Sequence, residues 1–126
     1  LGQPEPVRLE VFNLHLGLAT QERQRQAGLL LRSKEFAELD QRCACIVGGD
    51  FNTITERGVN ALAEQFAAAG LAHNSADLGP TFTRFGVRPS ATDHIFSRGF
   101  TKIDAGVRDD ITASDHFPVW TRLALP

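Results

Sequence analysis

The sequence predicts a layered α/β fold with a mixed sheet, and three of its features lead to this fold class. An alternating apolar pattern marks a strand near the start, two helix-forming stretches enclose a short apolar strand, and several strand-like segments close the chain. Strands that alternate with helices and are followed by more strands are typical of α/β layers. The length of 126 residues suits one domain over residues 1–126, with little room for a second.

The first strand is expected within residues 7–17, which read VRLEVFNLHLG. Its alternating apolar residues share one face, which we expect to point to the core: Val7, Leu9 and Val11. Asn13 and His15 continue the same face. The strand is therefore predicted to turn polar on its inner face just before it ends.

Residues 20–40 are rich in helix formers and predict a helix, for which Thr20 is a suitable N-cap. Three apolar residues give this helix an inward stripe: Leu29, Phe36 and Leu39. Gly28 is expected to weaken its middle, because glycine is a poor helix former.

The segment CACIVGG at residues 43–49 is almost wholly apolar and predicts a strand covered on both faces. An amphipathic helix is expected after the GGDFNT loop, with this apolar stripe: Val59, Leu62, Ala63, Phe66 and Ala69. Gly70 is expected to end that helix. Residues 73–80 predict a polar loop, and four strand-like segments follow: 81–85, 92–97, 101–107 and 117–125.

Charge and composition bear on the class of protein. The formal net charge of -2 provides no basic surplus, so nucleic-acid binding is not indicated. No stretch is long enough to cross a bilayer, and the first residues do not read as a signal peptide. Cys43 and Cys45 are expected to be small buried residues, which fits a reducing compartment and favours the cytoplasm. Because the chain opens at Leu1 and contains no methionine, we expect it to be part of a longer protein.

Four pairs of polar residues lie at or near predicted strand ends: Asn13 with His15, Asp50 with Asn52, Asp93 with His94, and Asp115 with His116. Each pair alone has a structural explanation, because Asp and Asn form turns and a lone His is commonly a hydrogen-bonded core residue. Ligands, however, bind at the strand ends of α/β sheets. Carboxylates and imidazoles gathered there suit phosphate chemistry around Mg²⁺. The four pairs together therefore predict a phosphate site.

The motifs NLHLG, GGDFNT, TDHIFS and SDHFPV, in this order, resemble the endonuclease/exonuclease/phosphatase superfamily. Its members include pancreatic-type deoxyribonucleases, apurinic endonucleases, inositol polyphosphate phosphatases and bacterial sphingomyelinases. The resemblance extends from about Val7 to Leu125. It implies a fold that corresponds to the C-terminal half of a four-layer αββα sandwich. It also implies a metal-dependent phosphoester hydrolase (phosphodiesterase, nuclease or phosphatase) that uses Mg²⁺ or Mn²⁺ and in-line attack by water.

The resemblance assigns a role to each matched motif residue. Asp50 matches the aspartate that positions or activates the attacking water and helps to bind the metal, and Asn52 matches the asparagine that orients water and phosphate. His116 matches the histidine that contacts the scissile phosphate. Asp93 matches the aspartate that pairs with this histidine and fixes its orientation.

Further roles follow from the same resemblance. Asp115 matches a metal-associated aspartate. His15 matches a second contact to the phosphate or leaving group, and Asn13 is expected to support it as a substrate-binding residue. His94 fills a variable position, for which a structural or rim role is expected.

The remaining histidine and four arginines receive no catalytic role. His73 is expected to be a solvated loop residue, and Arg23 and Arg25 to lie on a solvated helix face. Arg84 and Arg88 flank the TFTRFGVRPS loop, and a contact to substrate phosphate is the less favoured interpretation of them.

The superfamily's N-terminal half normally supplies an Asn and a QE glutamate, the principal metal ligand, and neither has a counterpart before Asn13. Gln21 and Glu22 spell the same pair but lie inside a predicted helix, so they are not its equivalent. A half sandwich leaves an apolar sheet face uncovered. We expect that face to be covered by a second copy, by the missing half as a separate segment, or by repacking. Metal affinity is expected to be poor without the glutamate.

Three functions are therefore compared. The first is hydrolysis of a phosphoester, and the second is a non-catalytic half-domain that serves assembly or binding and is inactive without the N-terminal half. The third, a DNA-binding nuclease fragment, is disfavoured by the net charge of -2. The sequence does not identify the substrate, for which the loop of residues 73–92 is the expected selector.

Overall fold

The computed structural model describes residues 2–3 and 5–126. A four-stranded sheet, sheet A, has the strand order β1-β2-β6-β3. β1 (Leu9–His15) is parallel to β2 (Ala44–Asp50), whereas β6 (Asp93–Arg98) is antiparallel to β2 and to the short β3 (Ala72–His73). The predicted α/β fold with a mixed sheet is thus confirmed.

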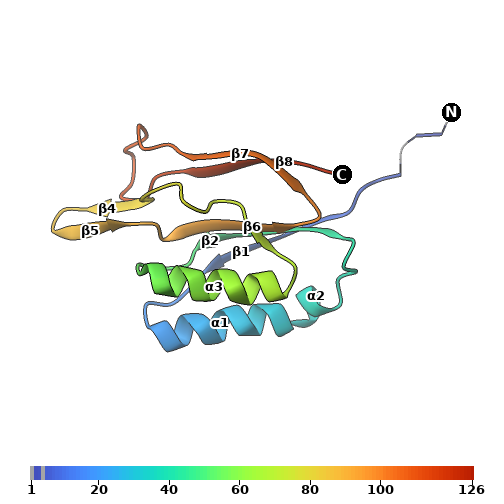
Figure 1. Ribbon diagram of the computed structural model, residues 1–126, viewed down its shortest axis with the longest axis horizontal. Coiled ribbons are helices and arrows are strands. Elements are labelled where there is room, and N and C mark those ends of the chain that lie inside the picture. The colour runs from blue at the N-terminus through green and yellow to red at the C-terminus, as the bar shows by residue number, and fades with distance from the viewer. Residues whose placement is uncertain (1, 4) are drawn as a thin grey trace.

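The elements form three layers (Figure 1). The helices cover one face of sheet A: α1 (Thr20–Arg32), α2 (Lys34–Ala37) and α3 (Glu56–Ala68). A hairpin of β7 (Thr101–Val107) and β8 (Val119–Ala124) lies on the other side, which we call the outer face. A second hairpin, of β4 (Phe82–Arg84) and β5 (Val87–Ser90), projects from one end of the molecule.

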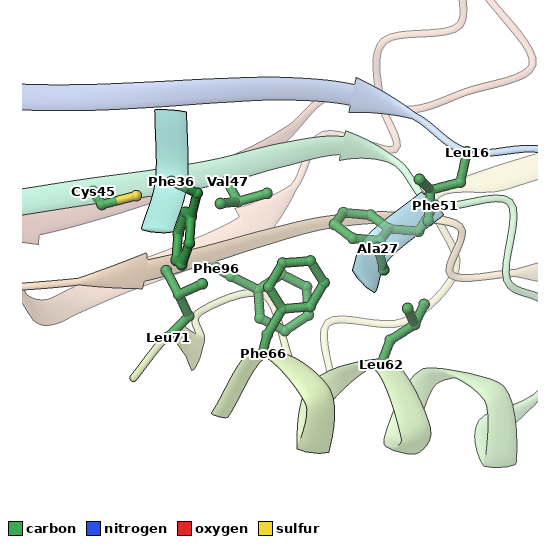
Figure 2. Close-up of a cluster of buried hydrophobic side chains, with 10 residues drawn as sticks. All are labelled: Leu16, Ala27, Phe36, Cys45, Val47, Phe51, Leu62, Phe66, Leu71 and Phe96. Atoms are coloured by element: carbon green, nitrogen blue, oxygen red, sulfur yellow. The ribbon is translucent and has the colours of Figure 1, made fainter. Parts of the chain in front are cut away.

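The hydrophobic core fills the space between sheet A and the helices (Figure 2). Phe51, Phe66 and Phe96 are almost fully buried, and the rings of Phe66 and Phe96 stack with centroids 4.6 Å apart. Burial of each such ring contributes roughly 1.5–3 kcal/mol. The core therefore holds α3 against β2 and β6, the strands that carry two of the predicted site residues.

The predicted inner face of the first strand is wrong. Val7, Leu9 and Val11 are exposed, at 63%, 48% and 63%. Phe12 and Leu14, which occupy the alternate positions of β1, pack on the core instead. The reason is that Phe12 packs on Phe36 of α2, with ring centroids 5.8 Å apart, so this side of the strand faces the helices. The outer face has only the β7–β8 hairpin above it.

The helix predicted for residues 20–40 is two helices. The break is at Ser33, whose extended backbone leaves α1 and whose hydroxyl accepts a hydrogen bond from the Phe36 N–H at 3.3 Å to cap α2. Thr20 is the first residue of α1 and Ala19 its N-cap, so the predicted cap is also wrong. Leu29 is 53% exposed, and Gly28 is buried because α1 approaches the Gln65 side chain of α3 there.

The predictions for β2 and α3 are close to the structure. β2 is the strand predicted from CACIVGG, shifted by one residue at each end. Thr55 caps α3 through the Gly58 N–H, so this helix begins earlier than its apolar stripe. Gly70, with φ of +83°, ends it as predicted, and its N–H donates to the Ala67 carbonyl.

The later strands match less evenly. β7 coincides with the predicted residues 101–107, and β6 and β8 begin one and two residues later than predicted. The polar loop predicted from residue 73 is partly ordered, because Asn74 and Ser75 are buried beside β6. β5 was not predicted. Cys45 is buried, Cys43 is half-buried, and both are free thiols.

Among the described residues, α1 and α3 are the longest helices at 13 residues each, and no helix meets the length and hydropathy needed to cross a membrane.

Candidate active site

Three predicted site residues lie side by side at one end of sheet A. His15 ends β1, Asp50 ends β2 and Asp93 begins β6. His15 is paired in register with Asp50, and Asp50 with Asp93. Residues paired in register point to the same face of a sheet, so the three side chains project together. We call this end of the molecule the site end.

His116 reaches this row from a distant part of the chain. Its segment runs antiparallel beside β4, where the Phe117 N–H donates to the Thr81 carbonyl and the Thr83 N–H to the Asp115 carbonyl. The His116 Nδ1 is 2.8 Å from the Asp93 Oδ2, and its Nε2 is 3.7 Å from the Asp50 Oδ2. The imidazole therefore lies between the two carboxylates.

Two threonines hold Asp93 in place. The Thr81 hydroxyl donates to the Asp93 Oδ2 at 2.7 Å and accepts the Asp93 N–H at 3.1 Å, and the Thr92 hydroxyl donates to the same Oδ2 at 3.0 Å. Both threonines are buried, at 2% and 5% exposure. Neither residue is among the site residues predicted from the sequence. The position of Thr92 directly before Asp93 was the available signal.

The surroundings of His116 change its pKa. Partial burial lowers the pKa, but the hydrogen bond and charge of Asp93, followed by the charges of Asp50 and Asp115, outweigh that effect. The pKa of His116 is therefore raised above its ordinary value of 6.5. Because the Asp93 carboxylate accepts the proton of Nδ1, the protonated ring directs its second N–H out from Nε2.

Asp50 and Asn52 form the turn that ends β2. The Asn52 N–H donates to the Asp50 Oδ1 at 2.8 Å, and Asn52 adopts a φ of +48°. Its side-chain Nδ2 donates to the Leu16 carbonyl at 2.6 Å. Gly49 before them has a φ of +146°, and a Cβ there would lie 1.9 Å from the Leu14 carbonyl oxygen. A glycine is thus required for β1 to approach this turn.

A shallow cavity of about 540 Å³ opens over these residues. His15, Asp50, Asn52 and His116 line it, together with the loop of residues 16–18. The His15 side chain is 73% exposed, and its Nε2 is 3.5 Å from the Asp50 Oδ2. Two imidazoles thus flank one carboxylate oxygen at the floor of an open pocket.

α1 fixes the loop that forms one wall of this cavity. The Gly17 N–H donates to the Gln26 Oε1 at 2.8 Å, and the Arg23 guanidinium donates to the Leu18 carbonyl and to the Thr20 hydroxyl. Arg23 is only 9% exposed, so its predicted place on a solvated face is wrong. Arg25 is exposed as predicted.

Two predicted site residues stand apart from the row. Asn13 is exposed on β1, two residues before His15 and opposite Gly48. Asp115 is exposed in the segment before β8, where the Ser114 hydroxyl donates to its Oδ1 at 3.4 Å. Its carboxylate is outside the group formed by Asp50, Asp93 and His116.

The chemistry of this group fits a divalent metal ion. Asp50, Asp93 and His116 each offer a ligand atom, and these atoms lie within 4.8 Å of one another. Carboxylate oxygens are preferred ligands of Mg²⁺ and Mn²⁺. Since the Asp93 Oδ2 already accepts hydrogen bonds from His116 and from two threonines, the Asp50 Oδ2 is the carboxylate oxygen best suited to a metal.

The other two histidines form a buried pair on the helix side of the sheet. His94 is 3% exposed, and its Nε2 donates to the Ala91 carbonyl at 3.0 Å. Its Nδ1 must then accept from the His73 Nε2, also at 3.0 Å. Burial, and next the charge of His94, lower the pKa of His73 to about 4. Of the structural and rim roles predicted for His94, its burial agrees with the structural one, and the solvated loop predicted for His73 is wrong.

Comparison with solved structures identifies similar folds. A Bacteroides thetaiotaomicron protein of the endonuclease/exonuclease/phosphatase family is 28% identical with a TM-score of 0.70, over 92% of this chain and 49% of its own. A mannosyl-6-phosphatase from the same species is 25% identical with a TM-score of 0.69, over 91% of this chain and 51% of its own. An Enterococcus faecalis protein of unknown function has the same fold, with a TM-score of 0.71. It is 20% identical, and the match covers 92% of this chain and 50% of its own.

The sequence matches the endonuclease/exonuclease/phosphatase family over residues 5–116, and the chain therefore belongs to that family. It spans about half the length of the solved structures that it matches. Among curated protein sequences, none matches it significantly. The superfamily resemblance inferred from the four motifs is confirmed.

Proposed function

We propose that this site hydrolyses a phosphoester by in-line attack of water, assisted by Mg²⁺ or Mn²⁺. The observation that carries the proposal is the placement of His116 between two carboxylates at the open end of the sheet, with its Nδ1 2.8 Å from the Asp93 Oδ2 and its Nε2 3.7 Å from the Asp50 Oδ2. Family membership supports phosphoester hydrolysis in general. The use of a divalent metal ion and the in-line attack by water go beyond family membership and are part of our proposal.

His116 is the proposed phosphate contact. Its raised pKa keeps the ring protonated to higher pH than a free imidazole, so that Nε2–H donates to a phosphate oxygen as charge develops there. Asp93 fixes the ring and balances its charge. The exposed His15 is a second contact, to the phosphate or to the leaving oxygen, and Asn13 supports it.

Asp50 is the residue that we propose acts on the attacking water. Its Oδ1 is occupied by the Asn52 N–H, whereas its Oδ2 lies between the two imidazoles and accepts a proton from, or positions, the attacking water. Asn52 orients this carboxylate through the turn. A divalent ion bound by Asp50, with Asp115 as a further candidate ligand, would polarise the phosphoryl oxygens.

The substrate class stays open within this proposal. One similar structure is a mannosyl-6-phosphatase, which makes sugar phosphates a class to test. The net charge of -2 does not favour nucleic acid.

A second candidate function is a non-catalytic half-domain that acts in assembly. Two observations favour it: the chain spans about half of its solved relatives, and Leu9 and Val11 of β1 are exposed on the apolar outer face. On this alternative the polar row needs a complementary half before any turnover.

The experiment that tests both is hydrolysis of a panel of phosphomonoesters and phosphodiesters with Mg²⁺ or Mn²⁺ by the 126-residue chain. Under the first proposal, Asp50→Ala and His116→Ala each lower turnover at least about a hundredfold, with the circular dichroism spectrum unchanged. Arg25→Ala, on an exposed helix face, is the control. Absence of turnover in a well-folded chain, together with no Mn²⁺ binding by calorimetry, would favour the assembly function.

A further inference from the structure

The site end carries an unusual share of the exposed apolar side chains. The connections β1–α1 and β2–α3, the β4–β5 hairpin and the β7–β8 connection all lie at this end (Figure 1). Five large apolar residues on them are exposed: Leu18 (83%), Ile54 (62%), Phe85 (105%), Val87 (46%) and Ile111 (38%). Single exposed apolar residues are ordinary, but exposed apolar residues on four connections at one end of the molecule need a reason.

The β4–β5 hairpin is the most prominent of these connections. It joins Thr81, which holds Asp93, to Thr92, and the Phe82 ring packs on His116 with centroids 4.9 Å apart. Its base is thus part of the site, while its tip projects beyond the body of the protein (Figure 1). Phe85 is fully exposed at that tip, next to Gly86, whose φ is +77°. A tight turn in water favours polar residues, and phenylalanine there is left without contacts.

The charge of the hairpin differs from that of the chain. The segment of residues 81–90, TFTRFGVRPS, has two arginines and no acidic residue, in a chain of net charge -2. Arg84 and Arg88 are exposed, and within the described part of the chain neither forms an ion pair. Guanidinium groups bind phosphate oxygens in bidentate fashion. Two guanidinium groups beside an exposed aromatic ring are therefore complementary to the surface of a lipid layer, where phosphate groups lie directly above hydrocarbon chains.

We propose that the site end docks on a phospholipid surface, with Phe85 inserted at the interface and Arg84 and Arg88 on lipid phosphates. Leu18 and Ile54 add apolar contacts from the neighbouring loops. Aliphatic side chains do not stack on bases, so this composition fits lipid better than single-stranded nucleic acid. The proposal extends the proposed function, because docking would present lipid phosphoesters to His116, but the docking does not depend on catalysis.

The test is cosedimentation of the 126-residue chain with vesicles of phosphatidylcholine, with and without phosphatidylglycerol. We expect binding, roughly a tenfold or greater loss of partitioning in Phe85→Ser, and, in the Arg84→Gln, Arg88→Gln double variant, a larger loss on the vesicles with phosphatidylglycerol than on phosphatidylcholine alone, because the former carry net negative charge. Ile103→Ser is the matched control, since Ile103 is 60% exposed near the opposite end of β7.

Three results would overturn the proposal: no vesicle binding by a chain with a native circular dichroism spectrum, equal losses in Phe85→Ser and Ile103→Ser, or binding of a single-stranded oligonucleotide, but not vesicles, through Phe85. Vesicle binding without hydrolysis of any phosphoester would reject only the catalytic proposal. Hydrolysis of soluble phosphoesters without vesicle binding would reject only this one.

Discussion

At the residue scale, the protonation of His116 depends on one carboxylate above the others. Replacing Asp93 with Asn removes its charge and leaves only a neutral amide oxygen to accept the weaker hydrogen bond from Nδ1, whereas Asp115→Asn removes only a smaller contribution to the pKa of His116. We expect a clear fall in the pKa of His116 in Asp93→Asn and a slight one in Asp115→Asn. The measurement is an NMR titration of the His116 ring protons. A pKa that is equal in Asp93→Asn and the parent would contradict the role given to Asp93.

The buried histidine pair makes a second prediction at this scale, on stability. The pKa of His73 is lowered to about 4 in the folded chain, against an ordinary value of 6.5, so the unfolded chain binds the proton first. Stability is therefore complete above pH 6.5 and declines as the pH falls towards 4, by on the order of 1–2 kcal/mol once solvent screening is allowed for.

Urea unfolding at several pH values measures this decline. His73→Phe keeps an aromatic ring beside Phe96, on which His73 stacks with centroids 4.5 Å apart, and removes the titrating group. We expect its stability to vary less between pH 6.5 and pH 4 than that of the parent. His15→Phe, at an exposed position, is the control. An unchanged slope in His73→Phe would show that other groups are responsible.

At the element scale, α1 positions the loop of residues 16–18 through two side chains one turn apart. Gln26 accepts the Gly17 N–H, and Arg23 donates to the Leu18 carbonyl. Gln26→Leu removes the acceptor, so the Gly17 amide should exchange with deuterium about tenfold faster or more, given the usual worth of a buried hydrogen bond. Gln26→Glu keeps an acceptor oxygen and should retain protection. Equal exchange in both variants would mean that Gln26 does not hold the loop, which would leave Arg23 at Leu18 and Asn52 at Leu16 as its anchors.

The elements differ in how far the sequence could predict them. β2 and α3 were predictable because an apolar run and a helix with Gly70 at its end have local causes. β1 was assigned the wrong inner face because both of its faces carry apolar residues, and only the packed structure decides which face the helices cover. β5 lacked an alternating pattern and is ordered only by pairing with β4.

The site residues also divide into those with local causes, which the sequence shows, and those placed by contacts between distant parts of the chain. Aspartates and histidines near strand ends are visible as pairs in the sequence, and His15, Asp50 and Asp93 do meet through the register of the strands. Thr81 was not predictable, because its bond to Asp93 spans 12 positions and threonine is common in strands. The buried place of His73 likewise depends on His94, 21 positions further along the chain.

At the scale of the whole molecule, one face of sheet A has no helical layer. A groove of about 450 Å³ lies between this outer face and β8, lined by apolar residues that include Val11, Ile46 and Trp120. β1 is also an edge strand, so its outer side offers unpaired backbone groups. An apolar face beside an open edge is the arrangement that associates with another chain.

We therefore expect the chain to self-associate when no complementary half is present. Sedimentation velocity should reveal dimers or larger species that grow with concentration. Leu9→Lys combined with Val11→Lys should shift them to monomer, because two charges cannot be buried unpaired in an apolar contact. Leu29→Lys, which places the same charge on an exposed position of α1, should leave the association unchanged. A parent chain that stays monomeric at all concentrations would mean that the outer face is satisfied by solvent and the β7–β8 hairpin alone. In that case the half-length of the chain would impose no need for a partner.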